Sequence, residues 1–231
     1  MKKIFFSLMM PSVLVILFIL PVNLVFARAF NNDFETGDLT DWEKEGAAFD
    51  FQPTWGDNPT ARNRGQPSNH QGDWWLGLFE KYQGPENKLG QNAGDVQGDG
   101  PQGTLTSIEF KIIGETMNFL IGGGFHPWEN DPGPCCVNLE VDGEVVRTST
   151  GQQAANTTET MIRAEWDISD LKGKTAQLVV VDQNGGGWGH PNFDDAHQAD
   201  ASGKNIPWDR VLAVDAHGKL AVSWAQMKKY Y

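Results

Sequence analysis

The chain has 231 residues, of which 30 are acidic and 18 are Lys or Arg, so its formal net charge is −12. This charge excludes a nucleic-acid-binding protein of the basic-patch kind, because such a protein needs a cationic surface to bind phosphates. Hydrophobic residues make up 39% of the chain and aromatic residues 11%, enough for a packed core, which excludes wholesale disorder. A single domain fits this length, since β-sandwiches of this size are commonly one unit.

The first segment has the pattern of a secretory signal peptide. A basic start at residues 2–3 precedes an apolar run over 4–20, and small residues follow at Ala27 and Ala29. We therefore expect residues 1–27 to be the signal peptide, although cleavage after Ala29 satisfies the same rule and an uncleaved anchor helix is the alternative. No later segment is apolar enough to span a bilayer. We expect a secreted, periplasmic or extracellular protein with no stable membrane span after cleavage.

Beyond this segment, apolar and polar residues alternate with period two between turn-forming residues, which is typical of half-buried strands. The clearest case is 136–150, where Asp142-Gly143 supplies a tight hairpin turn between two alternating runs. The other expected strands are 47–52, 74–79, 104–112, 117–121, 161–168, 175–181 and 192–199. Such a series of short strands predicts an all-β fold, a two-sheet antiparallel β-sandwich of the jelly-roll kind. We place this domain at 28–203 and assign no role to the tail at 204–231.

Two residue types in these patterns are expected to be structural. Trp42, Trp75 and Trp166 lie in strand-like runs, where a tryptophan more often packs in the core than binds a ligand. The cysteines are the neighbours Cys135 and Cys136. A bridge between adjacent residues closes a strained ring, so we expect free thiols at the start of a strand.

Three long loops carry side chains suited to sugars, which are bound by planar hydrogen-bonding groups and by aromatic faces. We expect these loops to converge on one binding pocket. The candidate ligand-binding residues are Trp55, Asp57, Arg62, Arg64, His126, Trp188 and His190. Glycines around Trp188 permit a close backbone approach to a ligand, and tight turn geometry is the alternative reason for them.

Carboxylates near the start of the mature chain have the spacing of a Ca²⁺ site. Asp33, Glu35 and Asp38 lie where a strand runs into a turn, and a fourth carboxylate from Asp194 or Asp195 would join the two ends of the domain. Ca²⁺ binds six to eight oxygens from carboxylates and backbone carbonyls. The alternative is that these acids only cap turns and face water.

Several of these segments together resemble the β-sandwich modules found beside family 32 glycoside hydrolases, grouped as carbohydrate-binding module family 66. The segments are 33–39 with Trp42, 56–62, 120–124, 141–147, and 186–190 with Asn192 and 194–195. The resemblance implies a jelly roll with a structural Ca²⁺, for which Glu35 and Asp195 would be side-chain ligands. It also implies a pocket for a terminal sugar of a glycan, a fructoside in the founding examples of the family.

One loop suggests an enzyme instead. Residues 128–133 resemble the Trp-x-Asn-Asp-Pro-x-Gly motif, whose Asp is the nucleophile of family 32 hydrolases, and Asp131 would hold that position. A retaining glycosidase needs a second carboxylic acid nearby, and the Arg-Asp-Pro motif that supplies it in that family is absent from the sequence. We interpret the match as chance and favour a monomeric, non-catalytic glycan-binding module. The alternatives are a small glycan-active hydrolase, an accessory domain split from a family 32 enzyme, and an adhesion domain that binds protein.

Overall fold

The computed structural model describes residues 29–59, 65–87, 89–151 and 158–210. The expected signal peptide, the loop residues Arg62 and Arg64, and the tail beyond 210 lie outside the described residues. Within these ranges, none of the helical segments is long and apolar enough to cross a membrane.

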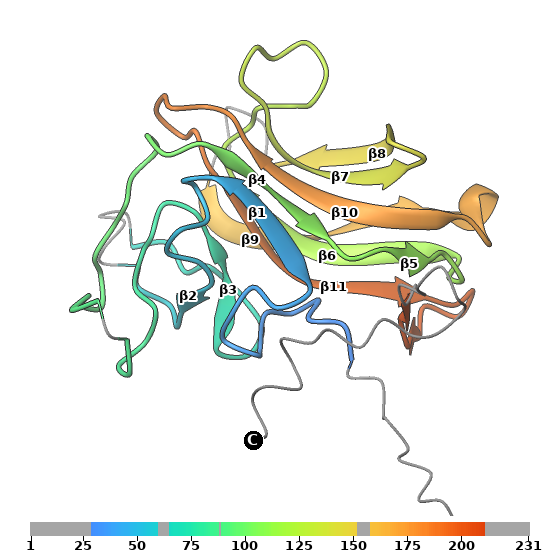
Figure 1. Ribbon diagram of the computed structural model, residues 1–231, viewed down its shortest axis with the longest axis horizontal. Coiled ribbons are helices and arrows are strands. Elements are labelled where there is room, and N and C mark those ends of the chain that lie inside the picture. Colours follow the sequence, from blue (N-terminus) through green and yellow to red (C-terminus); the bar gives the residue numbers. More distant parts are fainter. Residues whose placement is uncertain (1–28, 60–64, 88, 152–157, 211–231) are drawn as a thin grey trace, which may run out of the picture.

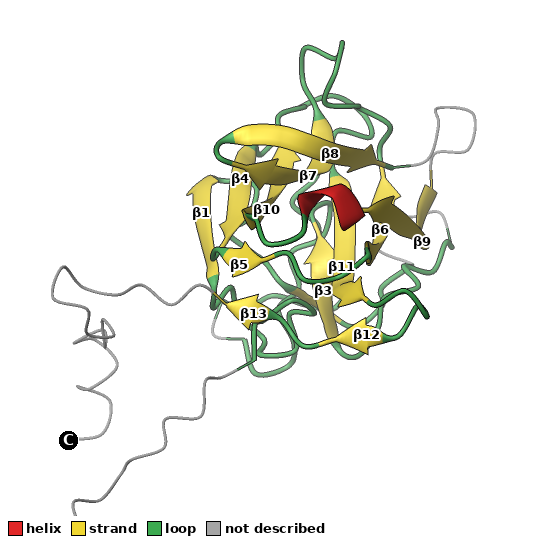
Figure 2. Ribbon diagram, turned by 90° about the vertical axis from the view of Figure 1, so that its right-hand side faces the viewer, coloured by secondary structure: helices red, strands yellow, loops and turns green. Residues whose placement is uncertain are grey.

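Two antiparallel sheets pack face to face, which confirms the predicted all-β sandwich (Figures 1 and 2). The first sheet contains β1 (Trp42–Gly46), β4 (Gly103–Ser107), β10 (Thr175–Asp182), β7 (Cys135–Val141) and β8 (Glu144–Thr150), with β5 (Phe110–Lys111) and β13 (Asp209–Arg210) beside the start of β10. The second sheet has the order β2 (Thr54–Trp55), β3 (Trp74–Gly77), β11 (Pro191–Ala199), β6 (Thr116–Gly123) and β9 (Thr158–Asp167), and β12 (Asn205–Ile206) pairs with β11. A single 3₁₀ turn, η2 (Ser169–Leu171), is the helical element of the described chain.

The alternating sequence pattern explains the core between the sheets. Leu105 of β4 and Leu178 of β10 face Phe119 of β6 and Phe193 of β11, and all four side chains are fully buried. The hairpin from β7 to β8 forms as predicted, because Asp142 and Gly143 adopt the positive φ angles of 53° and 80° that a tight hairpin turn requires.

The expected structural residues are buried, although not all in one core. Trp42 and Trp166 pack between the sheets, whereas Trp75 lies in a second cluster with Leu120 and Met161. The neighbouring cysteines are both free and buried. Because successive strand residues point to opposite faces, the two thiols separate: Cys136 packs with Val179 and Val181 in a third cluster.

The expected strand over 47–52 is wrong. The chain forms a turn there, with the Asp50 amide donating to the Ala47 carbonyl, and the strand is instead the preceding segment β1. Its charged, exposed side chains hide the alternation, since β1 is an edge strand.

The expected strand over 104–112 is interrupted, because the Ser107 hydroxyl accepts the Leu178 amide in the sheet. The sandwich also continues past 203 through β12 and β13.

We predict that Phe119→Ala lowers the free energy of unfolding by about 3–5 kcal/mol, the usual cost of a cavity left by a buried phenylalanine. The ring lies 4.5 Å from Trp166 and 5.8 Å from Phe193 between ring centroids. Urea unfolding followed by tryptophan fluorescence measures the loss. The control is Ile162→Ala in β9, whose side chain is 48% exposed and should cost only about 0.5 kcal/mol. Equal losses for the two variants would contradict this assignment of the core.

Candidate functional site at the start of strand β11

Strand β11 organises the polar side chains of the second sheet. It lies between β3 and β6, and Phe193 points from it into the core. Its neighbours Asn192 and Asp194 therefore point to the outer face of the sheet, where both are fully buried beneath covering segments. The loop that leads into the strand carries Trp188 and His190.

His190 joins three segments that are distant in sequence. Its Nδ1 lies 2.6 Å from Asp99 Oδ1, in the loop before β4, and its Nε2 lies 3.2 Å from Glu159 Oε2 in β9. The Asn192 amide also donates to Glu159 Oε2 at 3.0 Å. His190 and Glu159 are 2% and 3% exposed, and the Phe79 ring lies 5.3 Å from the imidazole between centroids. The imidazole is thus held on both nitrogens.

The electrostatics of this cluster favour a charged His190. Burial alone would lower its pKa, but the hydrogen bonds to Asp99 and Glu159 and the charges of these carboxylates raise the pKa to about 9. The ring is therefore an imidazolium at neutral pH. Nearby, burial raises the pKa of Asp182 to about 7, and the positive charge of His190 partly offsets this effect.

Trp188 lies directly against this imidazolium. The two rings are nearly parallel, with an interplanar angle of 19° and centroids 6.0 Å apart, and the indole remains partly exposed. The glycines around it serve tight backbone contacts within the protein. A Cβ at Gly189 would lie 2.1 Å from the Asn184 carbonyl oxygen, and one at Gly124 would lie 1.7 Å from the Trp188 carbonyl oxygen. Of the glycines around Trp188, Gly189 is therefore required by tight packing against neighbouring backbone, whereas a Cβ at Gly187 would meet nothing within 4 Å.

His126 belongs to the same end of the sandwich. Its Nδ1 lies 3.0 Å from Asp131 Oδ2 and 3.0 Å from Asn184 Nδ2, so it connects the loop between β6 and β7 to the loop before β11. Asp131 also accepts the Gly133 amide, and this hydrogen bond, with the contact to His126, lowers the pKa of the Asp131 carboxyl. Trp128 in this loop is 38% exposed. Asp131 therefore holds the shape of a loop that presents an aromatic side chain.

Two predicted ligand residues lie on other elements. Trp55 in β2 makes an edge-on contact with Tyr82 at 6.0 Å between centroids. Asp57 accepts the Ser68 amide at 3.1 Å. In Figure 1, β2 and β3 lie well apart from the loop between β6 and β7. The structure thus brings together His126, Trp188 and His190, whereas Trp55 packs on Tyr82 and Asp57 binds Ser68, whose carbonyl accepts the Met161 amide of β9.

The acids expected to bind Ca²⁺ have different environments. Asp33 accepts the Glu35 amide at 3.3 Å, and Asp38 Oδ1 accepts the Thr40 amide at 3.0 Å, so both carboxylates cap turns. Asp195 has a positive φ of 51° within a bulge of β11, and its oxygens lie 2.5 Å from Arg163 Nη2 and 2.5 Å from His197 Nε2.

Asp194, rather than Asp195, lies against the segment that binds Glu35. Glu35 Oε1 accepts the amides of Asp73 and Trp74 at 2.9 Å each, and the Gln71 amide donates to Asp194 Oδ2 at 2.8 Å. Asp194 is fully buried, and its Oδ1 has no hydrogen-bond partner among the described residues. Burial and the charges of Asp195 and Glu35 raise the pKa of Asp194 well above its usual value.

Glu35 and Asp194 alone supply fewer ligands than a Ca²⁺ ion requires. The described residues contain no group of three or more His, Cys, Asp and Glu side chains arranged to hold a metal ion. A cation at Glu35 and Asp194 would need backbone carbonyls and water for its remaining ligands, which is common for Ca²⁺.

Asp99 and Glu159 are site residues that sequence reasoning missed. Asp99 lies in a polar, glycine-rich segment that looks like a spacer, and Glu159 follows a strand start with no distinctive motif. No local pattern identifies either residue, because both are recruited by the histidine across 91 and 31 positions of the sequence.

No family model matches the chain. A protein of Aspergillus rugulosus named "Putative glycosyl hydrolase ecdE" is 37% identical over 99 residues, and the match covers 43% of this chain and 13% of that protein. Among solved structures, TmCBM61 in complex with β-1,4-galactotriose is similar with a TM-score of 0.41 and 17% identity, covering 74% of this chain and 97% of that one. The K2 cleaved adhesin domain of Lys-gingipain is similar with a TM-score of 0.34 and 13% identity, covering 71% of this chain and 95% of that one.

We predict that stability falls as the pH rises through the pKa of His190. Because the folded-state pKa of about 9 lies above the ordinary 6.5, the stabilisation is complete below about pH 6.5 and is lost as the pH passes about 9; the shift corresponds to about 3 kcal/mol. Asp99→Asn should flatten this dependence, since it removes one of the two carboxylates. Urea unfolding at several pH values measures the effect.

The matched control is Asp50→Asn, which removes a carboxylate that pairs with Lys44 at the surface. This variant should keep the wild-type slope between pH 6.5 and 9. An unchanged slope in Asp99→Asn would contradict the role of the histidine cluster.

Proposed function

We propose that this chain is a secreted, non-catalytic carbohydrate-binding module that recognises the terminal sugar of a glycan. The observation that carries the proposal is the convergence of His126, Trp188 and His190 at one end of the sandwich, with the exposed Trp128 on the adjoining loop. Aromatic faces and fixed polar groups are the two components of a sugar site. The match to 13% of a longer protein named as a glycosyl hydrolase supports a module that accompanies an enzyme.

In this proposal the buried cluster positions the binding groups. His190 is held on both nitrogens and stacks against the Trp188 ring, which is partly exposed and would contact the C–H bonds of a sugar. Asp131 and Asn184 fix His126 and are partly exposed, so they can exchange hydrogen bonds with sugar hydroxyls. A terminal fructoside is the ligand that the resemblance to family 66 modules suggests.

The second candidate function is a small glycan hydrolase, favoured by the name of the Aspergillus relative. A glycosidase needs two carboxyl groups free to flank the scissile bond. Here Asp99 and Glu159 both bind His190, and Asp131 binds His126 and the Gly133 amide. Because these carboxylates are committed to structure, we favour binding without turnover.

We also propose a structural Ca²⁺ between Glu35 and Asp194. The Oδ1 of the fully buried Asp194 supports it, because this oxygen accepts no hydrogen bond from the described residues, and a buried carboxylate oxygen without a donor is unfavourable unless a cation neutralises it. The ion would join the turn after residue 33 to β11 and the segment 71–74, and so pin both ends of the domain. Asp195, already paired with Arg163 and His197, would remain outside its coordination.

We predict that Ca²⁺ raises the melting temperature of the wild-type protein by several degrees and that a chelator reverses the change, since a ligand that binds only the folded state stabilises it. Glu35→Gln and Asp194→Asn should abolish the response. Asp195→Asn should retain it, although the loss of the contacts with Arg163 and His197 lowers the melting temperature without Ca²⁺. Differential scanning calorimetry with and without Ca²⁺ measures all four proteins. A response lost in Asp195→Asn but kept in Asp194→Asn would reverse our choice of ligand.

We predict that Trp188→Ala weakens glycan binding at least about tenfold, because a stacked aromatic residue usually dominates the energy of such a site. Affinity gel electrophoresis with levan, inulin and galactan measures binding, and a reducing-sugar assay on the same polysaccharides should detect no turnover. The control is Ile113→Ala, which removes an exposed apolar side chain before β6 and should leave retardation unchanged. Release of reducing sugar by the wild-type protein would favour the hydrolase.

A further inference from the structure

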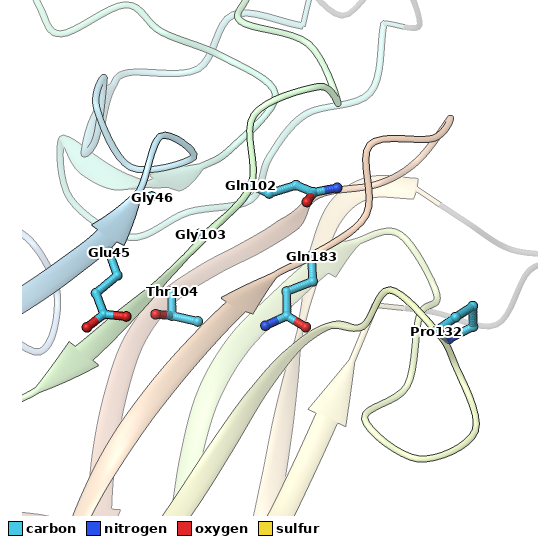
Figure 3. A pocket seen from close by; sticks show the side chains of 7 residues that line it. All are labelled: Glu45, Gly46, Gln102, Gly103, Thr104, Pro132 and Gln183. Carbon is cyan, nitrogen blue, oxygen red and sulfur yellow. The ribbon is translucent and has the colours of Figure 1, made fainter.

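An open groove of about 490 Å³ lies on the outer face of the first sheet. Figure 3 shows its side chains: Glu45 from β1, Thr104 from β4 and Gln183 after β10 lie side by side, Gln102 stands at one end, and Pro132 closes the far side. None of the residues that sequence reasoning assigned to ligand binding lines this groove.

The register of the strands explains why these side chains share one face. Glu45 is paired with Thr104, and Thr104 is paired with Val181 across β4 and β10. Side chains two positions apart along a strand point the same way, so Gln102 and Gln183 extend the row formed by Thr104 and Val181. The sheet therefore presents a line of polar groups across three strands.

At one end of the groove, the paired residues Gly46 and Gly103 leave the backbone without side chains. A Cβ at Gly46 would lie 2.4 Å from the Gln102 carbonyl oxygen, and one at Gly103 would lie 2.3 Å from the Glu45 carbonyl oxygen. Glycine is required at both positions by the close approach of β1 and β4. The floor is consequently smooth backbone that a chain-like ligand can lie across.

The polar groups in the groove have no partners within the described chain. The side chains of Glu45, Gln102, Thr104 and Gln183 form no hydrogen bond and no ion pair with another described residue, and Glu45, Gln102 and Gln183 are exposed. In contrast, a second groove lies beside β6 and β9 of the second sheet, and two acids that line it, Asp167 and Asp200, accept hydrogen bonds from the amides of Ser169 and Ser202.

The chemistry of the lining selects the class of ligand. Two primary amides and a hydroxyl both donate and accept hydrogen bonds, and Glu45 accepts them. No Lys or Arg is among the described residues that line the groove, and the chain carries a net charge of −12, so an anionic ligand is disfavoured. Neutral hydroxyl groups spaced along a chain match this lining.

We propose that this groove binds the interior of a neutral polysaccharide chain, as a second site beside the terminal-sugar site. The proposal rests on the carbohydrate-binding function proposed above and adds a distinct surface and a distinct part of the ligand. The groove is open along the sheet, so a chain can pass through it without presenting an end.

The experiment compares the double variant Gln102→Ala/Gln183→Ala with the wild-type protein in affinity gels containing levan, inulin or galactan. We expect the double variant to lose at least about fivefold in affinity for a polysaccharide that retards the wild-type protein. Its affinity for a free mono- or disaccharide, measured by calorimetry, should be unchanged. All substituted side chains are exposed, and circular dichroism and the melting temperature verify the fold.

A matched pair of charge variants completes the test. Glu45→Gln in the groove and Glu165→Gln on β9 of the opposite sheet remove one carboxylate each from an exposed position. We expect Glu45→Gln to change polysaccharide affinity modestly and Glu165→Gln not to change it. A loss caused by Glu45→Gln alone and suppressed by salt would indicate a cation-binding groove and overturn the proposal.

The outcomes separate this inference from the function on which it rests. If the wild-type protein is retarded by none of the polysaccharides, both fail. If the wild-type protein is retarded, Trp188→Ala abolishes the effect and Gln102→Ala/Gln183→Ala does not weaken it, the groove proposal alone is wrong.

Discussion

The interaction on which the candidate site depends is the double hydrogen bond of a buried His190 to Asp99 and Glu159. Burying charge is unfavourable unless each charge is paired and hydrogen-bonded, and removing one partner leaves an uncompensated charge inside the protein. The three segments that supply these side chains therefore cannot move independently. This constraint gives a fixed position to Trp188, which has a positive φ of 63° and no strand of its own.

Strand β11 shows how one strand serves both the core and a site. Its alternation places Phe193 in the core and Asn192 and Asp194 on the outer face. The bulge after Asp194 breaks this alternation and turns Asp195 toward Arg163 and His197. Two adjacent aspartates thus acquire opposite environments. Asp194 is buried with an oxygen that lacks a partner among the described residues, and Asp195 is held by an ion pair with Arg163 and a contact with His197.

Most of the sandwich could be predicted because period-two alternation directly reports burial on one face of a strand. Prediction failed where alternation is masked, as in the charged edge strand β1, or where a buried turn mimics it, as at Phe49. The site was harder to predict from the sequence. His190 is recognisable as a candidate, but its partners Asp99 and Glu159 lie near it only in the folded structure. The bulge that distinguishes Asp194 from Asp195 likewise leaves no mark in the sequence, because it depends on the register with β6.

The proposed terminal-sugar site and the groove on the first sheet share a boundary. Asp99 of the histidine cluster lies three residues before Gln102 of the groove, and Gln183 of the groove adjoins Asn184, which holds His126. The loops themselves touch, because a Cβ at Gly185 would lie 3.4 Å from Gln102 Nε2. A ligand chain lying along the groove would therefore reach the same two loops that position Trp188. The rigidity imposed by His190 fixes both surfaces at once, so loosening that cluster should affect chain binding in the groove as well as recognition at the tryptophan.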